Sequence, residues 1–368
     1  MSKTTLRDTQ RHHLGLFFSR TMSLQAWDKG GLLERELSFY QKLQRNLGGL
    51  TFVTYGDAND LRYTNRLLGL RVLCNRWRLP IRVYELIMLF VQAPWLRHVT
   101  VFKTNQTSVG HVALLAKFIY RKPLIARCGF MASEFAVREF GADSSRAKII
   151  IGLEKILFRF ADYIVVTTEQ MRQYISKFHN LPLQRVRVIP NYVDTERFKP
   201  LPEARKRNSI CFIGRLEQQK NLVALLEASK GLTHVELSLI GDGSLRTELL
   251  RLAQTYRLPV NFLGSLPYFS LPKHLNRAEI FVLPSLYEGH PKVLLEAMSC
   301  GRPVIGTDVP GIRELIRHRE TGFLCGTSPA DIRAAIQAVL SDMDLRMRIG
   351  RQAREFVLEN FTLERTVE

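Results

Sequence analysis

Residues 284 to 307 read PSLYEGHPKVLLEAMSCGRPVIGT, an order of strand, loop, short helix, glycine stop and strand. Pro291 suits the first turn of a helix and Gly301 suits its end, which predicts a helix from about residue 292 to 300. Such a unit builds a parallel sheet that is covered by helices. The stretch therefore predicts an α/β fold, with Glu288 in the loop before the helix.

The same alternation of short apolar runs and helical patterns continues in both directions along the chain. In the first half, strands are predicted at residues 13–19, 50–56, 99–104, 123–129 and 163–168. In the second half, strands are predicted at residues 209–214, 235–241, 260–264, 280–285, 303–307 and 322–325. The repetition predicts two doubly wound, Rossmann-like domains in tandem.

The domain boundary is expected between the two groups of strands, where Pro190, Pro200 and Pro202 interrupt regular structure. The predicted parts are an amino-terminal domain over residues 1–190, a linker over 191–207 and a carboxyl-terminal domain over 208–368. Doubly wound sheets bind ligands at the carboxyl ends of their strands. The expected functional site is therefore a cleft between the two domains.

Length and composition indicate a folded, globular protein. The chain has 368 residues, of which 46% are hydrophobic and 24% charged, which excludes a disordered protein. Its net charge of +19 is uneven: residues 1–200 carry 31 Lys and Arg against 15 Asp and Glu, and residues 201–368 carry 22 against 19. The net charges are thus +16 and +3, and we expect the two halves to face different partners.

Two segments of the basic half, residues 65–98 and 147–164, interleave Arg and Lys with large apolar residues at roughly helical spacing. This pattern is typical of helices that lie on an anionic bilayer surface. The alternative is a pair of core helices with a basic, solvated back. No apolar run approaches the roughly 20 residues that span a bilayer, so the expected attachment is peripheral, from the cytoplasm, on the inner face of the plasma membrane.

Cysteine spacing and the amino terminus fit that compartment. The five cysteines show no CxxC spacing, which indicates neither a zinc site nor a disulfide framework. The apolar run LGLFF near the amino terminus is too short for a signal peptide, and it is expected to begin the first strand.

The loop and helix of residues 284–300 form a candidate binding site. A helix that opens at the end of a strand offers unpaired N–H groups and a positive dipole end, both suited to phosphate. Glu288 and Glu296 each have two carboxylate oxygens, which can accept hydrogen bonds from the vicinal hydroxyls of a sugar. The alternative is that both are ordinary acids near a helix start.

A second set of candidates follows the first strand of the second half. In SICFIGRLEQQKNLVALLEA, residues 209–228, Arg215 comes just after the strand and Lys220 at the start of the next helix. Together they can neutralise a diphosphate, although a solvated pair is the alternative. Gly241 and Gly243 stand at another turn from strand to helix, where small residues allow the backbone to approach a ligand.

These segments together resemble a known family. Residues 288–324, EGHPKVLLEAMSCGRPVIGTDVPGIRELIRHRETGFL, closely resemble the E-x7-E region of retaining GT-B glycosyltransferases, the large group often called family 4. GRLEQQKN, residues 214–221, is similar to that family's diphosphate-binding element. The resemblance implies a GT-B fold and transfer of a sugar, with retention, from a nucleoside-diphosphate sugar to a glycan or lipid-linked acceptor, in the synthesis of a cell-surface polysaccharide, lipopolysaccharide or glycolipid.

The resemblance also implies roles for residues. Glu288 is expected to contact the hydroxyls of the donor sugar, and Glu296 the ribose of the nucleotide. Gly30 and Gly31, which open a helix after the first strand, match the family's amino-terminal glycine loop less closely, and a plain turn is the alternative. The predicted catalytic residues are Arg215, Lys220 and Glu288. The predicted donor-binding residues are Gly30, Gly31, Gly241, Gly243, Arg215, Lys220, Glu288, Gly289, Pro291, Lys292, Val293 and Glu296.

The chain departs from the family at one position. Many relatives carry a histidine shortly after the fourth strand, whereas this chain reads IARCGFMASEF, residues 125–135. Arg127 or the backbone near Gly129 is a candidate for that space, and His111 is the nearest histidine. His290 stands beside Glu288, where it either contacts a substrate or packs the loop.

Two further expectations complete the hypothesis. No Asp-x-Asp element stands where a metal ion would be expected, so the leaving diphosphate is expected to be stabilised without a metal or other cofactor, by Arg215, Lys220 and helix-end N–H groups. The alternatives are another GT-B enzyme, such as a nucleotide-sugar epimerase or a glycan phosphorylase, and a non-catalytic membrane- or nucleic-acid-binding protein. Nucleic acid is not an expected partner, because no recognisable binding motif is present.

Overall fold

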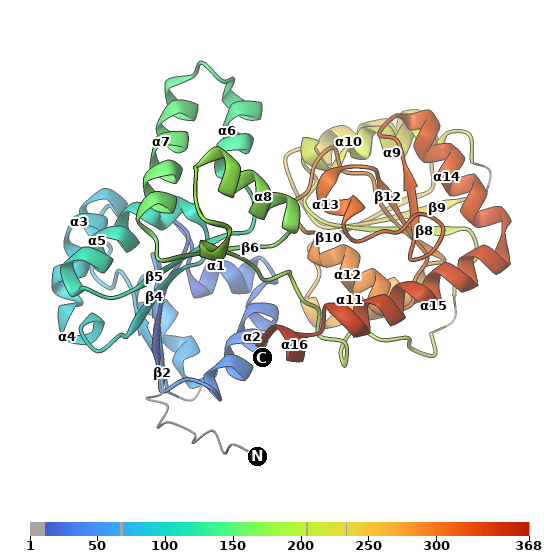
Figure 1. Ribbon diagram of the computed structural model, residues 1–368. Helices are drawn as coiled ribbons and strands as arrows, with labels where there is room; N and C mark the ends of the chain where they lie inside the picture. The colour runs from blue at the N-terminus through green and yellow to red at the C-terminus, as the bar shows by residue number, and fades with distance from the viewer. Residues whose placement is uncertain (1–11, 67–68, 204, 233, 368) are drawn as a thin grey trace, which may run out of the picture. The chain divides into compact units, whose positions relative to one another are not determined.

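The computed structural model describes residues 12–66, 69–203, 205–232 and 234–367. The chain divides into two compact units, Met1–Val188 and Ile189–Glu368 (Figure 1). Each unit is an α/β domain with a parallel sheet between layers of helices, as the sequence predicts. The residues before the first strand, 1–11, lie outside the described part of the chain.

The sheet of the first unit has the strand order β3-β2-β1-β4-β5-β6-β7, with every neighbouring pair parallel. Its strands are β1 (His13–Phe17), β2 (Gly49–Val53), β3 (Leu70–Leu73), β4 (Val101–Thr104), β5 (Leu124–Cys128), β6 (Tyr163–Val166) and β7 (Val186–Val188). The order reverses between β1 and β4, as in a doubly wound fold.

Helices cover both faces of this sheet. They are α1 (Leu24–Lys29), α2 (Leu33–Gln44), α3 (Ile81–Val91), α4 (Ala93–Leu96), α5 (Gly110–Tyr120), α6 (Ala132–Phe140), α7 (Ser145–Phe160) and α8 (Glu169–Phe178). One buried cluster unites α1 and α2 with the sheet through Trp27 and Tyr40. The other unites α3, α5 and α7 with the opposite face through Tyr84, Val112 and Leu157.

The sheet of the second unit has the strand order β10-β9-β8-β11-β12-β13, again all parallel. Its strands are β8 (Ser209–Ile213), β9 (Glu236–Ile240), β10 (Val260–Gly264), β11 (Ile280–Leu283), β12 (Val304–Thr307) and β13 (Phe323–Cys325). The order reverses between β8 and β11, and every residue of these two strands is buried.

The helices of the second unit are α9 (Leu222–Ser229), α10 (Arg246–Thr255), α11 (Leu271–Arg277), α12 (Lys292–Ser299), α13 (Pro310–Arg313), α14 (Pro329–Ser341), α15 (Met343–Asn360) and α16 (Leu363–Val367). Helices α9, α10 and α14 lie on one face of the sheet, and α11, α12 and α15 on the other (Figure 1). The predicted helix at residues 292–300 is confirmed as α12, with Cys300 as its C-cap.

Two strands were not predicted. The helical pattern assigned to residues 65–98 is wrong at residues 70–73, which form β3. There Leu70 and Val72 are buried while Arg71 is exposed, and the four residues pair with β2. This alternation of period two is that of a strand, and it was hidden inside a longer apolar and basic segment. The other unpredicted strand, β7, is only three residues long.

Residues 191–207, expected as a linker, cluster with the second unit. The backbone N–H of Val193 donates to the Phe361 carbonyl at 2.9 Å, and the Asn276 side chain donates to the Lys199 carbonyl at 2.9 Å. Phe198 is fully buried in the core of that unit. The segment is therefore part of the second domain's packing.

Candidate functional site

The candidate site of the second unit lies where the strand order reverses. β8 leads into Gly214 and Arg215, and β11 leads into the loop Pro284–Pro291, which in turn opens α12. Because β8 and β11 are parallel neighbours, both loops emerge at the same edge of the sheet. This edge is the usual ligand position of a doubly wound domain.

Lys220 and Glu288 meet at this edge. Lys220 Nζ and Glu288 Oε1 form an ion pair, although 68 positions separate the two residues in sequence. The side chains are only 12% and 8% exposed, so water screens the pair weakly. The Ser285 hydroxyl donates a further hydrogen bond to Glu288 Oε1, at 2.7 Å. The structure thus brings together two of the predicted catalytic residues and holds the carboxylate from two sides.

Gln219 fastens the turn that carries Lys220 to the loop that carries Glu288. Its side-chain amide donates to the Tyr287 carbonyl at 2.9 Å, and its own carbonyl accepts from the Leu286 N–H at 2.8 Å. The turn and the loop therefore form one unit. The sequence pattern did not single out Gln219 or Ser285, since polar residues in loops are common and only their contacts distinguish them.

Arg215 is exposed, in contrast to Lys220. Its neighbour Glu217 accepts hydrogen bonds from the hydroxyl and the backbone N–H of Ser244, at 2.6 and 3.1 Å. These hydrogen bonds, followed by the charge of Arg215, lower the pKa of Glu217. Glu217 therefore links the loop after β8 to the loop after β9, a role that the sequence analysis missed.

Gly241 and Gly243 approach the chain itself rather than an open space. A Cβ atom on Gly241, whose φ is +134°, would lie 1.9 Å from the Gly214 carbonyl oxygen. A Cβ atom on Gly243 would lie 2.6 Å from the Leu216 carbonyl oxygen. Both glycines are thus required for packing of the loop after β9 against the backbone that carries Arg215. This is a structural reason for glycine in addition to the predicted contact with a ligand.

Glu296 lies in the second turn of α12 and is 2% exposed. Its carboxylate accepts a hydrogen bond from the Tyr268 hydroxyl at 3.2 Å. Tyr268 follows β10, so this contact joins α12 to the loop at the far side of the sheet. The structure therefore places Glu296 inside the domain, with a tyrosine as a partner that the sequence did not indicate.

The start of α12 is built from the remaining predicted donor-binding residues. Pro291 is the N-cap and makes no side-chain capping bond, Lys292 lies over the Tyr192 ring at 4.6 Å, and Val293 is half-buried. The carbonyls of Glu288 and Gly289 lie against Gly311 in α13, where a Cβ atom would be 2.5 and 2.1 Å from their oxygens. Gly311 therefore supports the loop, which the sequence analysis missed.

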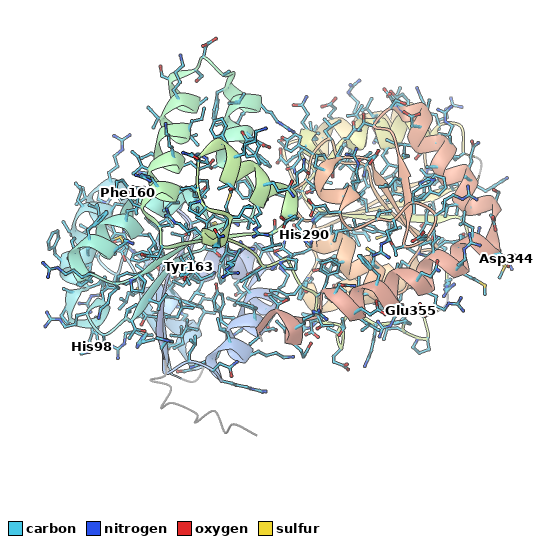
Figure 2. All side chains as sticks on the ribbon, viewed as in Figure 1. His98, Phe160, Tyr163, His290, Asp344 and Glu355 are labelled. Atoms are coloured by element: carbon cyan, nitrogen blue, oxygen red, sulfur yellow. The ribbon has the colours of Figure 1, made fainter. Side chains whose placement is uncertain are left out.

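His290 packs inside the second unit (Figure 2). Its ring lies 5.5 Å from the Phe361 ring, and its carbonyl accepts a hydrogen bond from the Asn191 amide at 2.6 Å. The side chain is only 6% exposed. These contacts support the loop-packing alternative for His290.

In the first unit, Gly30 and Gly31 lie between α1 and α2. Helix α1 lies between β1 and Gly30, and Gly30 is its C-cap, donating to the Ala26 carbonyl at 3.0 Å. Gly31 has a φ of +67° and leads toward α2. The two glycines thus stand just before α2, which begins at Leu33, as the sequence predicts, and their contact with a donor stays a prediction.

A polar cluster of the first unit gathers around Glu85, which is 9% exposed. The Tyr55 hydroxyl donates to Glu85 Oε1 at 3.0 Å, and Arg20 Nη2 donates to Oε2 at 3.1 Å. His111 Nε2 lies 3.6 Å from Oε1. Burial, and then the charge of Glu85, raise the pKa of Tyr55. Arg20, Tyr55 and His111 follow β1, β2 and β4, so the cluster lies at the carboxyl edge of the sheet.

Of the candidates for the missing histidine, His111 thus belongs to the cluster around Glu85, and Arg127 and Gly129 lie elsewhere on the same edge. Arg127 Nη1 donates to the Asn105 carbonyl at 3.3 Å, and the Gly129 N–H donates to the Gln106 side chain at 3.0 Å.

Among the residues that the structure describes, no group of three or more His, Cys, Asp and Glu is arranged to hold a metal ion. Within the same residues, no helix is long and apolar enough to cross a bilayer.

Two family profiles match the chain. Residues 193–356 match the family described as glycosyl transferases group 1, and residues 38–197 match glycosyltransferase family 4. The chain is 27% identical to glycogen synthase of Mycobacterium tuberculosis over 69% of its own length and 63% of the relative's. It is 30% identical to UDP-Gal:alpha-D-GlcNAc-diphosphoundecaprenol alpha-1,3-galactosyltransferase of Escherichia coli, over 63% of this chain and 66% of that protein. The match thus spans just under two thirds of these relatives.

Solved structures with the same fold cover nearly the whole chain. Sucrose-phosphate synthase from Thermosynechococcus elongatus has a TM-score of 0.83 at 22% identity, covering 97% of this chain and 96% of that one. Anabaena HepE in complex with UDP and glucose has a TM-score of 0.78 at 17% identity, covering 97% of both chains. At these identities the likeness establishes the fold.

Proposed function

Because this chain belongs to the group 1, or family 4, glycosyltransferases and has the GT-B fold, we propose that it transfers a sugar from a nucleoside-diphosphate sugar to an acceptor hydroxyl. The observation that carries the proposal is the Lys220–Glu288 ion pair, held at the ligand edge of the second unit. An ammonium group can bind a diphosphate, and a carboxylate can bind sugar hydroxyls. The pair therefore offers adjacent groups for the two parts of such a donor.

The proposed reaction breaks the bond between the anomeric carbon of the donor and the diphosphate oxygen. The diphosphate leaves with the bonding electrons, the acceptor oxygen forms the new bond to the anomeric carbon, and the acceptor proton is released. Lys220, Arg215 and the N–H groups at the start of α12 stabilise the negative charge that develops on the diphosphate. We propose that the reaction proceeds with retention and without a metal ion.

The relatives suggest which substrates to test first. HepE has been solved with UDP and with UDP-glucose, so UDP-sugars are the first donors. The Escherichia coli relative is named for an acceptor on diphosphoundecaprenol. We therefore propose a glycan or lipid-linked acceptor, of the kind used to build a cell-surface polysaccharide, lipopolysaccharide or glycolipid.

The surface of the first unit supports peripheral attachment to a membrane. Large apolar side chains are exposed on several of its helices, among them Leu86 at 72% and Phe90 at 68% on α3, and Ile149 at 61% on α7. This half of the sequence also carries the excess of basic residues. Apolar groups beside Lys and Arg are the composition of helices that bind anionic bilayers. We propose that the protein works from the cytoplasm on the inner face of the plasma membrane, and its five free cysteines fit a reducing compartment.

The test is release of nucleoside diphosphate from a panel of sugar nucleotides, followed by transfer to extracted lipid-linked acceptors. Lys220→Ala is expected to reduce release by about 100- to 1,000-fold, the usual effect of removing one group that stabilises transition-state charge. Lys230→Ala is the matched control, since Lys230 lies at the other end of α9 over the Tyr256 ring. Equal activity of both variants would contradict the role of Lys220.

Two further measurements separate this proposal from its alternatives. The anomeric configuration of the product, read by proton NMR, tests retention, and an unchanged rate after dialysis against a chelator tests independence from metal. An epimerase would instead convert one donor sugar into another without an acceptor. No response to any donor by folded protein would refute the proposed donor site.

A further inference from the structure

Helix α7 presents an apolar stripe to solvent. Ile149, Leu153, Ile156 and Phe160 recur at helical spacing along it, and each is at least 46% exposed. The Phe160 ring, labelled in Figure 2, meets a ring of α5: it lies edge-on to Phe118 at 5.8 Å between centroids according to the geometry of the two rings. The stripe therefore continues onto α5, where Leu115 and Ile119 are also exposed, rather than ending at the border of one helix.

The charges beside this stripe are positive. Lys148, Lys155 and Arg159 are exposed on α7, and each directly neighbours a residue of the stripe. The one carboxylate of α7, Glu154, is 3% exposed and accepts a hydrogen bond from the Ser133 hydroxyl at 2.6 Å. The outward surface of α7 is thus apolar and basic, which is complementary to a bilayer with anionic headgroups.

A cavity of about 250 Å³ opens at the carboxyl-terminal end of this helix. Its lining residues are Lys155, Ile156, Arg159, Phe160 and His179. The lining contains cationic groups and no carboxylate. Ligand pockets are usually roughly 300–1,000 Å³, so this cavity is small for a sugar nucleotide but of the size of a phosphate with a short attached group.

His179 forms part of the wall of this cavity. Its ring packs edge-on against Phe158 and Phe178, at 5.1 and 5.0 Å. Both ring nitrogens are buried and have no hydrogen-bond partner in the described part of the chain. Burial, and then the charge of Lys155, lower the pKa of His179.

Arg185 removes an obstacle to binding an anion there. The carboxyl end of a helix carries partial negative charge, which would repel phosphate. Arg185 Nη2 donates to the carbonyls of Phe158 and Arg159 at 3.2 and 3.1 Å, and also to that of Ala161. The last carbonyls of α7 are therefore already bonded to a cation.

We propose that this cavity binds the phosphate of an anionic phospholipid headgroup when the stripe of α7 and α5 rests on a bilayer. Lys155 and Arg159 supply the charge, and Ile156 and Phe160 contact the acyl boundary. The inference rests on the membrane attachment proposed above, and it adds a defined site to what would otherwise be a diffuse basic surface.

The experiment measures binding of the full-length protein to vesicles by flotation, with phosphatidylcholine alone and with added phosphatidylglycerol. Each basic residue near an anionic surface contributes roughly fivefold to affinity, so Lys155→Gln with Arg159→Gln is expected to weaken binding to the anionic vesicles about 30-fold. The matched control is Arg146→Gln with Lys148→Gln, which removes the same charge from the other end of α7. Because Lys148 lies 3.5 Å from Asp143, the control is expected to lose about fivefold at most.

Melting temperature and nucleoside-diphosphate release without vesicles should match the wild type in the Gln variants, which separates loss of binding from loss of fold.

Three outcomes would overturn the inference. Equal losses in the pocket pair and the control pair would mean a diffuse charge effect with no site. Displacement of the protein from vesicles by soluble glycerol phosphate would mean a site for free phosphate esters instead of a membrane headgroup. No flotation with any vesicle would refute the membrane attachment itself, while the donor screen would still test the sugar transfer separately.

Discussion

The ion pair between Lys220 and Glu288 should be visible as a coupling energy in the stability of the second unit. Lys220→Met leaves a carboxylate that is 8% exposed with its Ser285 hydrogen bond. Removing one partner of a buried pair costs about 3–5 kcal/mol, and we expect the lower end, about 3 kcal/mol, because that hydrogen bond remains. For a domain of this size the loss corresponds to a fall in Tm of about 6–12 °C.

Glu288→Gln should cost less, about 2 kcal/mol, because the ammonium of Lys220 sits on a flexible stem and can turn toward water. The variant with both changes should then be about 2 kcal/mol more stable than the sum of the single losses predicts. Scanning calorimetry of the four proteins gives the cycle. Arg313→Met breaks the exposed pair with Asp308 in the same unit, and its Tm should stay unchanged. A coupling below about 0.5 kcal/mol between Lys220 and Glu288 would refute the reasoning.

Three other predictions concern packing, pH and thiol reactivity. Gly311→Ala should weaken donor binding and lower the Tm, because its Cβ atom would lie 2.1 Å from the Gly289 carbonyl oxygen. Gly152→Ala is the control: its Cβ atom meets nothing within 4 Å, so the change should stabilise the protein by about 0.5–1 kcal/mol. An unchanged Tm of the Gly311→Ala variant in the same melting experiments would contradict the role given to Gly311. Burial raises the pKa of Glu154, so protonated Glu154 contributes stability below the ordinary pKa of a glutamate, and this contribution is lost as the pH rises through the raised pKa. The Tm of the Glu154→Gln variant should therefore increase relative to that of the wild type from acidic to neutral pH. A difference in Tm that does not change with pH would contradict this prediction. Burial raises the pKa of Cys211 to about 12 and that of Cys325 likewise to about 12, so both thiols should react with a maleimide at neutral pH only after the protein is denatured. Mass spectrometry of labelled peptides measures this, and labelling of either cysteine in the folded protein would contradict the prediction.

The fold was predictable where strands are buried on both faces and end at glycine or proline. The runs SICFI and IFVL are such strands, and the helix after IFVL is bounded by Pro291 and Gly301. The hydrophobic pattern and the positions of proline and glycine therefore predict the same elements there. At β3 the sequence pattern is ambiguous between a strand and a helix. LRVL is only four residues long, and its exposed Arg71 made it look like one face of a longer basic helix. Only the pairing with β2 distinguishes a strand from a helix at these residues. Strand pairing is a contact between residues far apart in sequence, so the local pattern does not reveal it.

The residues of the candidate site were predictable as types but not as partners. Strand order places Lys220 and Glu288 at one edge, yet whether two opposite charges face a ligand or each other depends on loop geometry to within about an ångström. The role of Gly311 was hidden for a similar reason. A glycine after a proline usually signals a turn, whereas Gly311 lies in α13 and is required by two carbonyls from a loop more than 20 positions earlier.

The ion pair between Lys220 and Glu288 has a consequence for which molecules can bind at this site. A simple anion that engages the ammonium leaves the carboxylate nearly buried with one hydroxyl partner, and a simple polyol that engages the carboxylate leaves the ammonium unmatched. A ligand that binds only one of the two side chains therefore leaves the other charge buried and uncompensated, which is unfavourable. A ligand that brings an anionic group and hydroxyl donors on one scaffold satisfies both at once. We therefore expect the site to bind inorganic phosphate or free sugar weakly, and a molecule that joins the two more tightly.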